Sequence, residues 1–279
     1  MRVTDHKAAI EQERVKNGIG GLYLSENLMH SIQNMTDEIV NILSANNPSV
    51  YLYGSVALDD FQFGWSDIDI LVLTEKQISR EHAESLVHLR QELTGREPEN
   101  PYYRLFEGGM LRLSAFLTGS SDTVVYWGTS GEQITYYYNC DSFCKINLPD
   151  DGILLYGDDI RGQIGRPSFE ELRADIQRHY ETVRKYGGKT GKSLYSFGWL
   201  LDISRCIYTL RTGKIIAKTK AGEWALENGL CPDVTALQTA LLVRNNPLRF
   251  ERDETLQHYT ESLGNAVHAY ADVLEKELL

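Results

Sequence analysis

Hydrophobic and polar residues follow two different periods in the first half of the chain. Apolar residues recur at helical spacing from Ser25 to Ala45 and again from Ser79 to about Leu93, and both serines suit helix N-caps. Short apolar runs typical of strands occupy residues 50–53, 68–74, 102–117 (split into two halves at Gly108-Gly109), 123–126 and 153–157. This mixture predicts an α/β or α+β domain built on a short mixed sheet.

The second half of the chain has helical periodicity and no convincing strand. Ser168 and Glu171 form a capping-box pattern that opens a helix to about Tyr186. Further helices are predicted at 190–212, 219–228, 234–245 and 253–277. We therefore expect two domains, residues 1–160 and an all-α helical bundle over residues 161–279, with the first twenty residues frayed or loosely helical.

Composition narrows the class of protein. The 279 residues are 42% hydrophobic and 24% charged, as in soluble globular proteins. The net charge of −11 argues against nucleic acid as a partner and suits a cationic acceptor. No apolar run is long enough to span a membrane, and the N-terminus lacks the apolar region of a secretory signal. These features predict a cytoplasmic protein whose four scattered cysteines are reduced thiols.

The stretch from residue 49 to residue 75 carries the candidate chemistry. An apolar strand ends at a Gly54-Ser55 turn, and a second apolar strand begins with Asp67 and Asp69. Residues two apart in a strand point to the same face, so these two carboxylates project together. They repel each other unless a cation lies between them, and Mg²⁺ takes oxygen ligands of this kind. Gly54 permits close approach of a phosphate, and Ser55 adds a hydroxyl and an amide N–H.

The whole pattern is more specific than either half of it. It consists of a strand, Gly-Ser, about ten residues and then Ser-Asp-x-Asp at the start of a second strand. This order resembles the signature of the DNA-polymerase-β-like nucleotidyltransferase superfamily. The resemblance implies a Mg²⁺–nucleoside triphosphate donor and transfer of a nucleoside monophosphate to a hydroxyl. From pattern alone Glu107 is equally an exposed acid at a hairpin turn. The superfamily's strand–helix–strand order makes it the third carboxylate, ahead of Asp122 and Asp141.

Basic residues in the second half form another candidate group. Arg205 falls within an apolar stripe of the helix predicted over 190–212. A buried guanidinium needs an anion, which is either an acid such as Asp202 or the triphosphate. Three lysines follow and open the next predicted helix, whose N-terminus favours phosphate, namely Lys214, Lys218 and Lys220.

This second pattern sharpens the resemblance. The second half resembles the C-terminal domain of streptomycin/spectinomycin-type aminoglycoside adenylyltransferases. The resemblance rests on a helix with Ser-Arg and aromatic residues, followed by Thr-Gly-Lys-Ile, a Lys four residues on and a Glu-Trp-Ala helix. The resemblance implies that Ser55, Arg205 and Lys218 contact the nucleotide, that Asp67 and Asp69 hold Mg²⁺ and that Glu107 is the base. To the nucleotide-binding residues we add Gly54, Ser66 and Lys214.

The expected activity is Mg²⁺-dependent transfer of AMP from ATP to a hydroxyl of a small, cationic acceptor such as spectinomycin. Such adenylylation of an antibiotic would give resistance to it. We expect the enzyme to be a monomer or a homodimer. The loop at residues 185–196 has no Trp and no acid where streptomycin-modifying members carry both, which argues against streptomycin. The alternative is a nucleotide-binding regulatory or toxin–antitoxin protein that acts on a protein partner. The presence of all three candidate carboxylates favours the enzyme.

Overall fold

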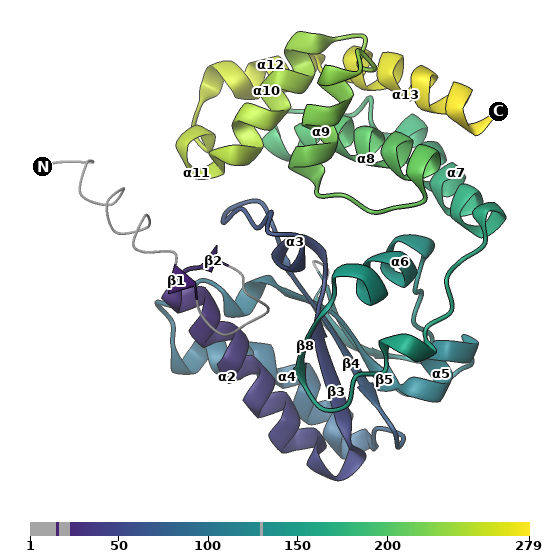
Figure 1. Cartoon of the computed structure of the whole chain (residues 1–279). Coiled ribbons are helices and arrows are strands. Elements are labelled where there is room, and N and C mark those ends of the chain that lie inside the picture. The colour runs from purple at the N-terminus through teal and green to yellow at the C-terminus, as the bar shows by residue number, and fades with distance from the viewer. Residues whose placement is uncertain (1–14, 17–22, 129–130) are drawn as a thin grey trace, which may run out of the picture. The chain divides into compact units, whose positions relative to one another are not determined.

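The computed structural model describes residues 15–16, 23–128 and 131–279 (Figure 1). The chain divides into two compact units, each made of three segments. The first unit comprises residues 1–59, 67–139 and 151–164, and the second comprises residues 60–66, 140–150 and 165–279. We expected the first twenty residues to be frayed, but most of them lie outside the described ranges. Within them, Val15–Lys16 forms strand β1, which pairs with β2 (Tyr23–Leu24).

The first unit is built on a mixed six-stranded sheet with the order β7-β6-β5-β4-β3-β8. Its strands in chain order are β3 (Pro48–Leu52), β4 (Ile68–Thr74), β5 (Phe106–Arg112), β6 (Val124–Gly128), β7 (Gly131–Thr135) and β8 (Ile153–Tyr156). The pairing of β4 with β5 is parallel and the other pairings in this sheet are antiparallel. The predicted mixed sheet is therefore confirmed, with β8 at one edge as expected.

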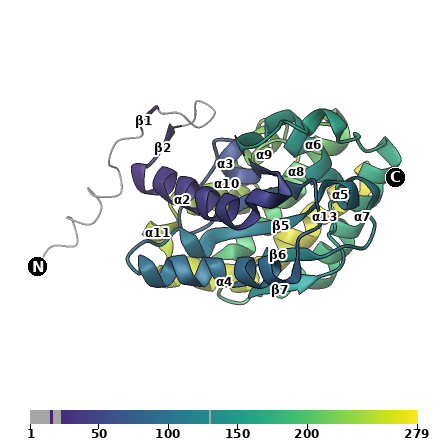
Figure 2. The ribbon, with the colours of Figure 1, turned by 90° about the horizontal axis from the view of Figure 1, so that it is seen from below.

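Two long helices of this unit begin where the sequence predicted. The Ser25 hydroxyl accepts a hydrogen bond from the Leu28 amide at the start of α2 (Glu26–Leu43), and Ser79 caps α4 (Arg80–Arg96) in the same way. The two helices contact each other, and α2 packs on β3 and β8 while α4 packs on β6 and β7 (Figure 2). Their buried apolar stripes, including Ile32 and Leu86, cover the sheet core.

The segment around Gly108-Gly109 differs from its prediction. Instead of two strands split by a turn, β5 runs unbroken through both glycines, and residues Leu113–Thr118 form helix α5. A Cβ on Gly108 would lie 2.9 Å from the carbonyl carbon of Ile70 on β4, and one on Gly109 would lie 2.9 Å from Cζ of Tyr138. These glycines therefore allow close approach of neighbouring groups and do not form a turn. The sequence pattern also gave no sign of β7, and the Gly54-Ser55 turn forms the start of a short helix, α3 (Gly54–Ala57).

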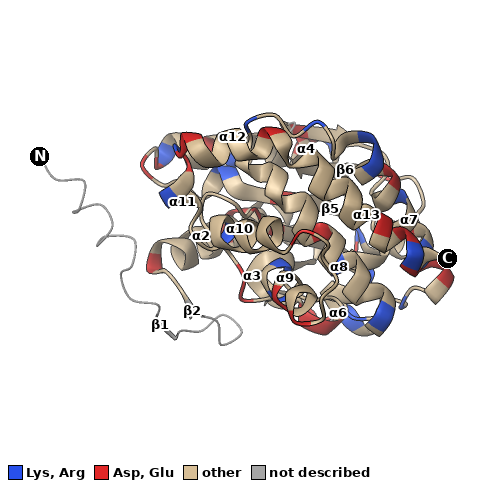
Figure 3. Cartoon of the chain, turned by 90° about the horizontal axis from the view of Figure 1, so that it is seen from above, with Lys and Arg blue, Asp and Glu red and all other residues tan. Residues whose placement is uncertain are grey.

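The second unit is helical, as predicted. Its helices are α6 (Ser142–Asp151), α7 (Phe169–Tyr186), α8 (Gly198–Thr212), α9 (Lys218–Glu227), α10 (Val234–Asn245), α11 (Pro247–Phe250), α12 (Glu254–Ser262) and α13 (Gly264–Leu278). Helix α8 is central and packs against α7, α9, α10 and α13. The capping box of Ser168 and Glu171 is present at the start of α7. Acidic and basic residues are interspersed along α7 and α13 (Figure 3).

Two predicted helices of this unit are shorter or broken. The helix predicted from residue 190 begins at Gly198, after a 3-10 turn at Leu194–Phe197. The helix predicted over 253–277 breaks at Leu263 into α12 and α13. A buried ion pair of Arg244 and Asp60, 2.6 Å apart, holds the segment 60–66 within this unit. No helix among the described residues is long and apolar enough to cross a membrane.

Candidate active site

Strand β4 positions the two aspartates. Asp67 directly precedes the strand and Asp69 is its second residue, while the intervening Ile68 is fully buried. Successive side chains of a strand alternate between faces, so the two carboxylates share the face opposite to Ile68. The sequence pattern is therefore realised in the fold.

Glu107 joins the aspartates from the neighbouring strand. In the parallel ladder of β4 and β5, Asp69 lies in register with Glu107, which places the two side chains on the same face of the sheet. Burial raises the pKa of Glu107, and the negative charge of Asp67 raises it further. The pKa of Tyr126 on β6 is also raised, mainly by burial. The negative charges of Glu107, Asp69 and Asp67 raise it further. The three carboxylates thus form one electrostatic group.

The structure decides against the hairpin interpretation of Glu107. The residue is the second of a continuous strand, and no turn follows it. The two competing acids have structural partners instead. Asp122 is buried and pairs with Arg112 at 2.7 Å, whereas Asp141 accepts the Cys144 amide at 2.9 Å at the start of α6.

Hydrogen bonds join the segment from Tyr53 to Ser55 to the backbone carbonyls of both aspartates. The Tyr53 amide donates to the Asp69 carbonyl at 3.1 Å, and the Ser55 hydroxyl donates to the Asp67 carbonyl at 3.1 Å. Gly54 has φ +64°, and a Cβ there would lie 2.7 Å from Cγ of Asp69 and closer still to Oδ2. Glycine is therefore required for conformation and for space. Ser66 is buried, and its hydroxyl accepts the Gln62 amide at 3.1 Å, so it closes the turn that precedes Asp67.

The aspartate pair fits a magnesium ion that is completed by substrate. No group of three or more His, Cys, Asp or Glu side chains within the described ranges could hold a metal ion alone. Mg²⁺ is commonly bound by one or two carboxylates together with substrate phosphates and water. Asp67 and Asp69 supply such a pair, and the repulsion among neighbouring carboxylates favours a cation between them.

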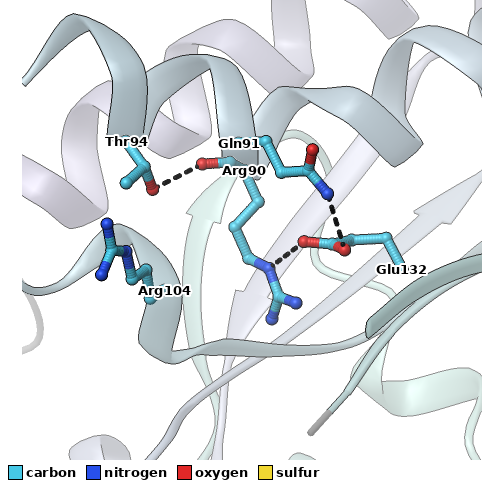
Figure 4. Close-up of a pocket in the computed structure, with 5 residues that line it drawn as sticks. All are labelled: Arg90, Gln91, Thr94, Arg104 and Glu132. Carbon is cyan, nitrogen blue, oxygen red and sulfur yellow. Dashed lines mark hydrogen bonds and ion pairs between the residues drawn. The ribbon is translucent and has the colours of Figure 1, made fainter. Parts of the chain in front are cut away.

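A buried arginine lies behind this group and was missed in the sequence. Arg90 of α4 donates through Nε to Glu132 at 2.6 Å (Figure 4). Its Nη1 donates to the Phe106 carbonyl at 2.7 Å. Its positive charge partly opposes the rise in the pKa of Glu107. Both residues of the ion pair line a cavity of about 400 Å³ together with Gln91, Thr94 and Arg104. The signal was that Arg90 falls four residues after Leu86 and three before Leu93, on the inward-facing apolar stripe of the predicted helix.

The basic residues predicted to bind nucleotide lie in the second unit, where two of them share one acid. Asp202 lies 3.2 Å from Arg205 and 3.0 Å from Nζ of Lys218. Burial alone would raise the pKa of Asp202, but Lys218 and then Arg205 outweigh it and lower that pKa to about 2. The structure therefore shows the Asp202 ion pair that the sequence left as one of two possibilities. Lys214 lies apart, in the exposed loop between α8 and α9.

Comparison with known proteins agrees with both units. A family model described as a nucleotidyltransferase domain matches residues 36–100, and one described as the C-terminal domain of aminoglycoside adenylyltransferase matches residues 169–273. No curated protein matches the chain. A crystal structure of spectinomycin adenyltransferase AAD(9) from Enterococcus faecialis with ATP and spectinomycin aligns with a TM-score of 0.62 at 17% identity, covering 88% of this chain and 99% of that one. At this identity the likeness shows a shared fold.

Proposed function

We propose that this chain, which carries a match to a nucleotidyltransferase domain and a match to the C-terminal domain of aminoglycoside adenylyltransferase, transfers AMP from ATP to a hydroxyl of an aminoglycoside or aminocyclitol. The observation that carries the proposal is the group of Asp67, Asp69 and Glu107 on one face of the sheet, beside a glycine-serine turn. The AAD(9) structure, whose crystals held ATP and spectinomycin, supports this choice of donor and acceptor.

In the proposed reaction each residue has a separate task. Asp67 and Asp69 would hold Mg²⁺, which when bound offsets the negative charge of the phosphates. The acceptor oxygen forms a bond to the α-phosphorus while the bond to pyrophosphate breaks, and the hydroxyl proton passes to the carboxylate of Glu107. The backbone of Gly54 and Ser55 lies close to the aspartates, where its N–H groups can donate to a phosphate oxygen.

Arg205 and Lys218 are proposed to bind the triphosphate. Each has hydrogen-bond donors beyond the one directed at Asp202, because a guanidinium carries five and an ammonium three. Ser66 would act by fixing the turn before Asp67, and Lys214 would contribute its exposed charge. Spectinomycin is preferred to streptomycin as acceptor because the loop at residues 185–196 carries no tryptophan and no acid.

The test is turnover by the full chain. Incubation with labelled ATP, Mg²⁺ and a panel containing spectinomycin, streptomycin and other aminoglycosides, followed by mass spectrometry, should show an acceptor heavier by one AMP. Replacing Glu107 with Gln keeps its size but removes the base, so kcat should fall by about 10²–10⁴-fold while ATP binds nearly normally. A panel without any adenylylated product, or label found on a polypeptide, would exclude this proposal.

A further inference from the structure

Arg90 is a charged residue in an apolar setting. It is 9% exposed, and its partner Glu132 is also largely buried, with a side chain 9% exposed. Burying an ion pair costs desolvation that a hydrophobic pair of similar volume would avoid, and such a pair is often neutral or destabilising in net effect. Stability alone therefore gives little reason for an arginine at this position of α4.

The contacts of Arg90 indicate another reason. Its Nη1 donates to the Phe106 carbonyl at 2.7 Å, and this carbonyl belongs to the peptide group that leads into Glu107. Its Nη2 approaches the carbonyl of Gly128, at the end of β6, at 3.4 Å. One turn earlier in α4, the Leu86 carbonyl accepts the indole N–H of Trp127 at 3.0 Å. Helix α4 thus holds the start of β5 and the end of β6 together.

Strand β5 pairs with β4 along its whole length, but its pairing with β6 begins only at Gly108, so Phe106 and Glu107 lie before the first β5–β6 pair. The strand begins at Phe106, directly after the 3-10 turn η2 (Tyr103–Leu105), and Gly108 and Gly109 follow Glu107. Both glycines are held by pairs with β4 and β6, whereas on the β6 side the Phe106–Glu107 peptide lies outside those pairs, where Arg90 holds the Phe106 carbonyl. A fixed Phe106–Glu107 peptide plane restricts where the Glu107 side chain can point.

We propose that Arg90 is a positioning residue for the transfer reaction: by holding the Phe106 carbonyl it places the Glu107 carboxylate where it accepts the acceptor's proton. This inference rests on the proposed role of Glu107. Arg90 touches neither nucleotide nor acceptor in this account, and Glu132 and Gln91 serve to orient the guanidinium, since Gln91 donates to the second oxygen of Glu132 at 3.2 Å.

The experiment separates the hydrogen bond to Phe106 from the ion pair. The Glu132→Gln variant removes the charge of the ion pair but keeps a side-chain oxygen that can accept from Nε of Arg90, so the guanidinium stays oriented on the Phe106 carbonyl and kcat should stay within about threefold of the unchanged enzyme. The double variant Arg90→Met with Glu132→Gln leaves no buried unpaired charge and lacks the bond to Phe106. Its kcat should fall by about 10- to 100-fold with KM for ATP nearly unchanged, as for a small misplacement of a reacting group. Arg90→Lys should recover part of this loss, because an ammonium can still donate to one carbonyl.

A double-mutant cycle with Glu107→Gln distinguishes positioning from a general structural role. If Arg90 acts through Glu107, adding Arg90→Met and Glu132→Gln to the Glu107→Gln variant should cause little further loss of kcat. A structural role would lower kcat equally in both backgrounds, which would overturn the inference, as would a kcat unchanged by the double variant. If that variant does not fold, Arg90→Lys replaces it in the cycle and is judged in the same way.

Failure of the proposed function gives a different result. Glu107→Gln with undiminished turnover would show that Glu107 is not the base, and the inference about Arg90 would fall with it. A strong loss in Glu107→Gln combined with full activity in the Arg90 variants would leave the proposed function standing and refute the inference alone. Thermal unfolding of every variant confirms that each is folded at the assay temperature.

Discussion

Replacing Gly54 with Ala should impair transfer through the position of Asp69. The new Cβ would lie 2.7 Å from Cγ of Asp69, whereas ordinary contacts of a Cβ begin at 3.4 Å. The carboxylate must therefore retreat by about 0.7 Å at Cγ, and further at Oδ2, or the turn must move away from it. A misplacement on the order of 1 Å can cost about 10²-fold in rate, so we expect kcat to fall by about that factor.

Backbone strain is a second consequence of this change and needs its own control. Gly54 has φ +64°, where a residue with a Cβ pays about 1–2 kcal/mol. Gly119 has φ +65°, and a Cβ added there would meet nothing within 4 Å, so Gly119→Ala carries a similar strain and no clash. Gly54→Ala should lose at least as much thermal stability as Gly119→Ala, measured by calorimetry, but only Gly54→Ala should lose turnover. Turnover and Mg²⁺ dependence in Gly54→Ala that match those of Gly119→Ala would refute the argument.

Two further predictions concern the acids of the two units. Asp67→Asn and Asp69→Asn should each abolish transfer with an unchanged far-ultraviolet circular dichroism spectrum, because these charges serve the cation and not the core; full turnover in either variant would contradict the metal assignment. Asp202→Asn should lower the free energy of unfolding by about 2 kcal/mol at neutral pH, as expected from a pKa lowered from 3.8 to about 2. Because the pKa of Asp202 is lower in the folded state, this contribution to stability is complete above about pH 4 and disappears as the pH falls through about 2. Urea unfolding of the unchanged protein and of Asp202→Asn across that range should show the difference in unfolding free energy shrinking. A difference independent of pH would refute the role of the ion pair.

Features that depend only on residues close together in the chain could be predicted from the sequence alone. The caps at Ser25, Ser79 and Ser168 are local hydrogen bonds between a side chain and an amide three residues on, so a short pattern specifies them. The shared face of Asp67 and Asp69 follows from the alternation of any strand. The helical second half followed from periodicity, which also depends on the chain alone.

The role of the glycines depends on contacts with residues distant in the chain. Gly108 and Gly109 have the composition of a turn, yet they lie within β5, where Ile70 and Tyr138 approach too closely for a side chain at either position. Sequence patterns record conformational freedom and do not record which distant atom makes use of it. The same limit hid the start of α5, whose residues alternate as a strand would.

Long-range partners likewise appeared only in the fold. Glu107 stands beside Asp69 because β4 and β5 pair in parallel with that register, and residues 38 apart in the chain meet there. Arg90 reaches the Phe106 carbonyl and Glu132 because α4 packs over the end of the sheet. Asp202, three residues from Arg205, was already a candidate partner in the sequence, whereas Lys218, which shares that acid, was found only in the fold. A buried charge requires a partner, but its identity depends on which segments the fold brings within hydrogen-bond distance.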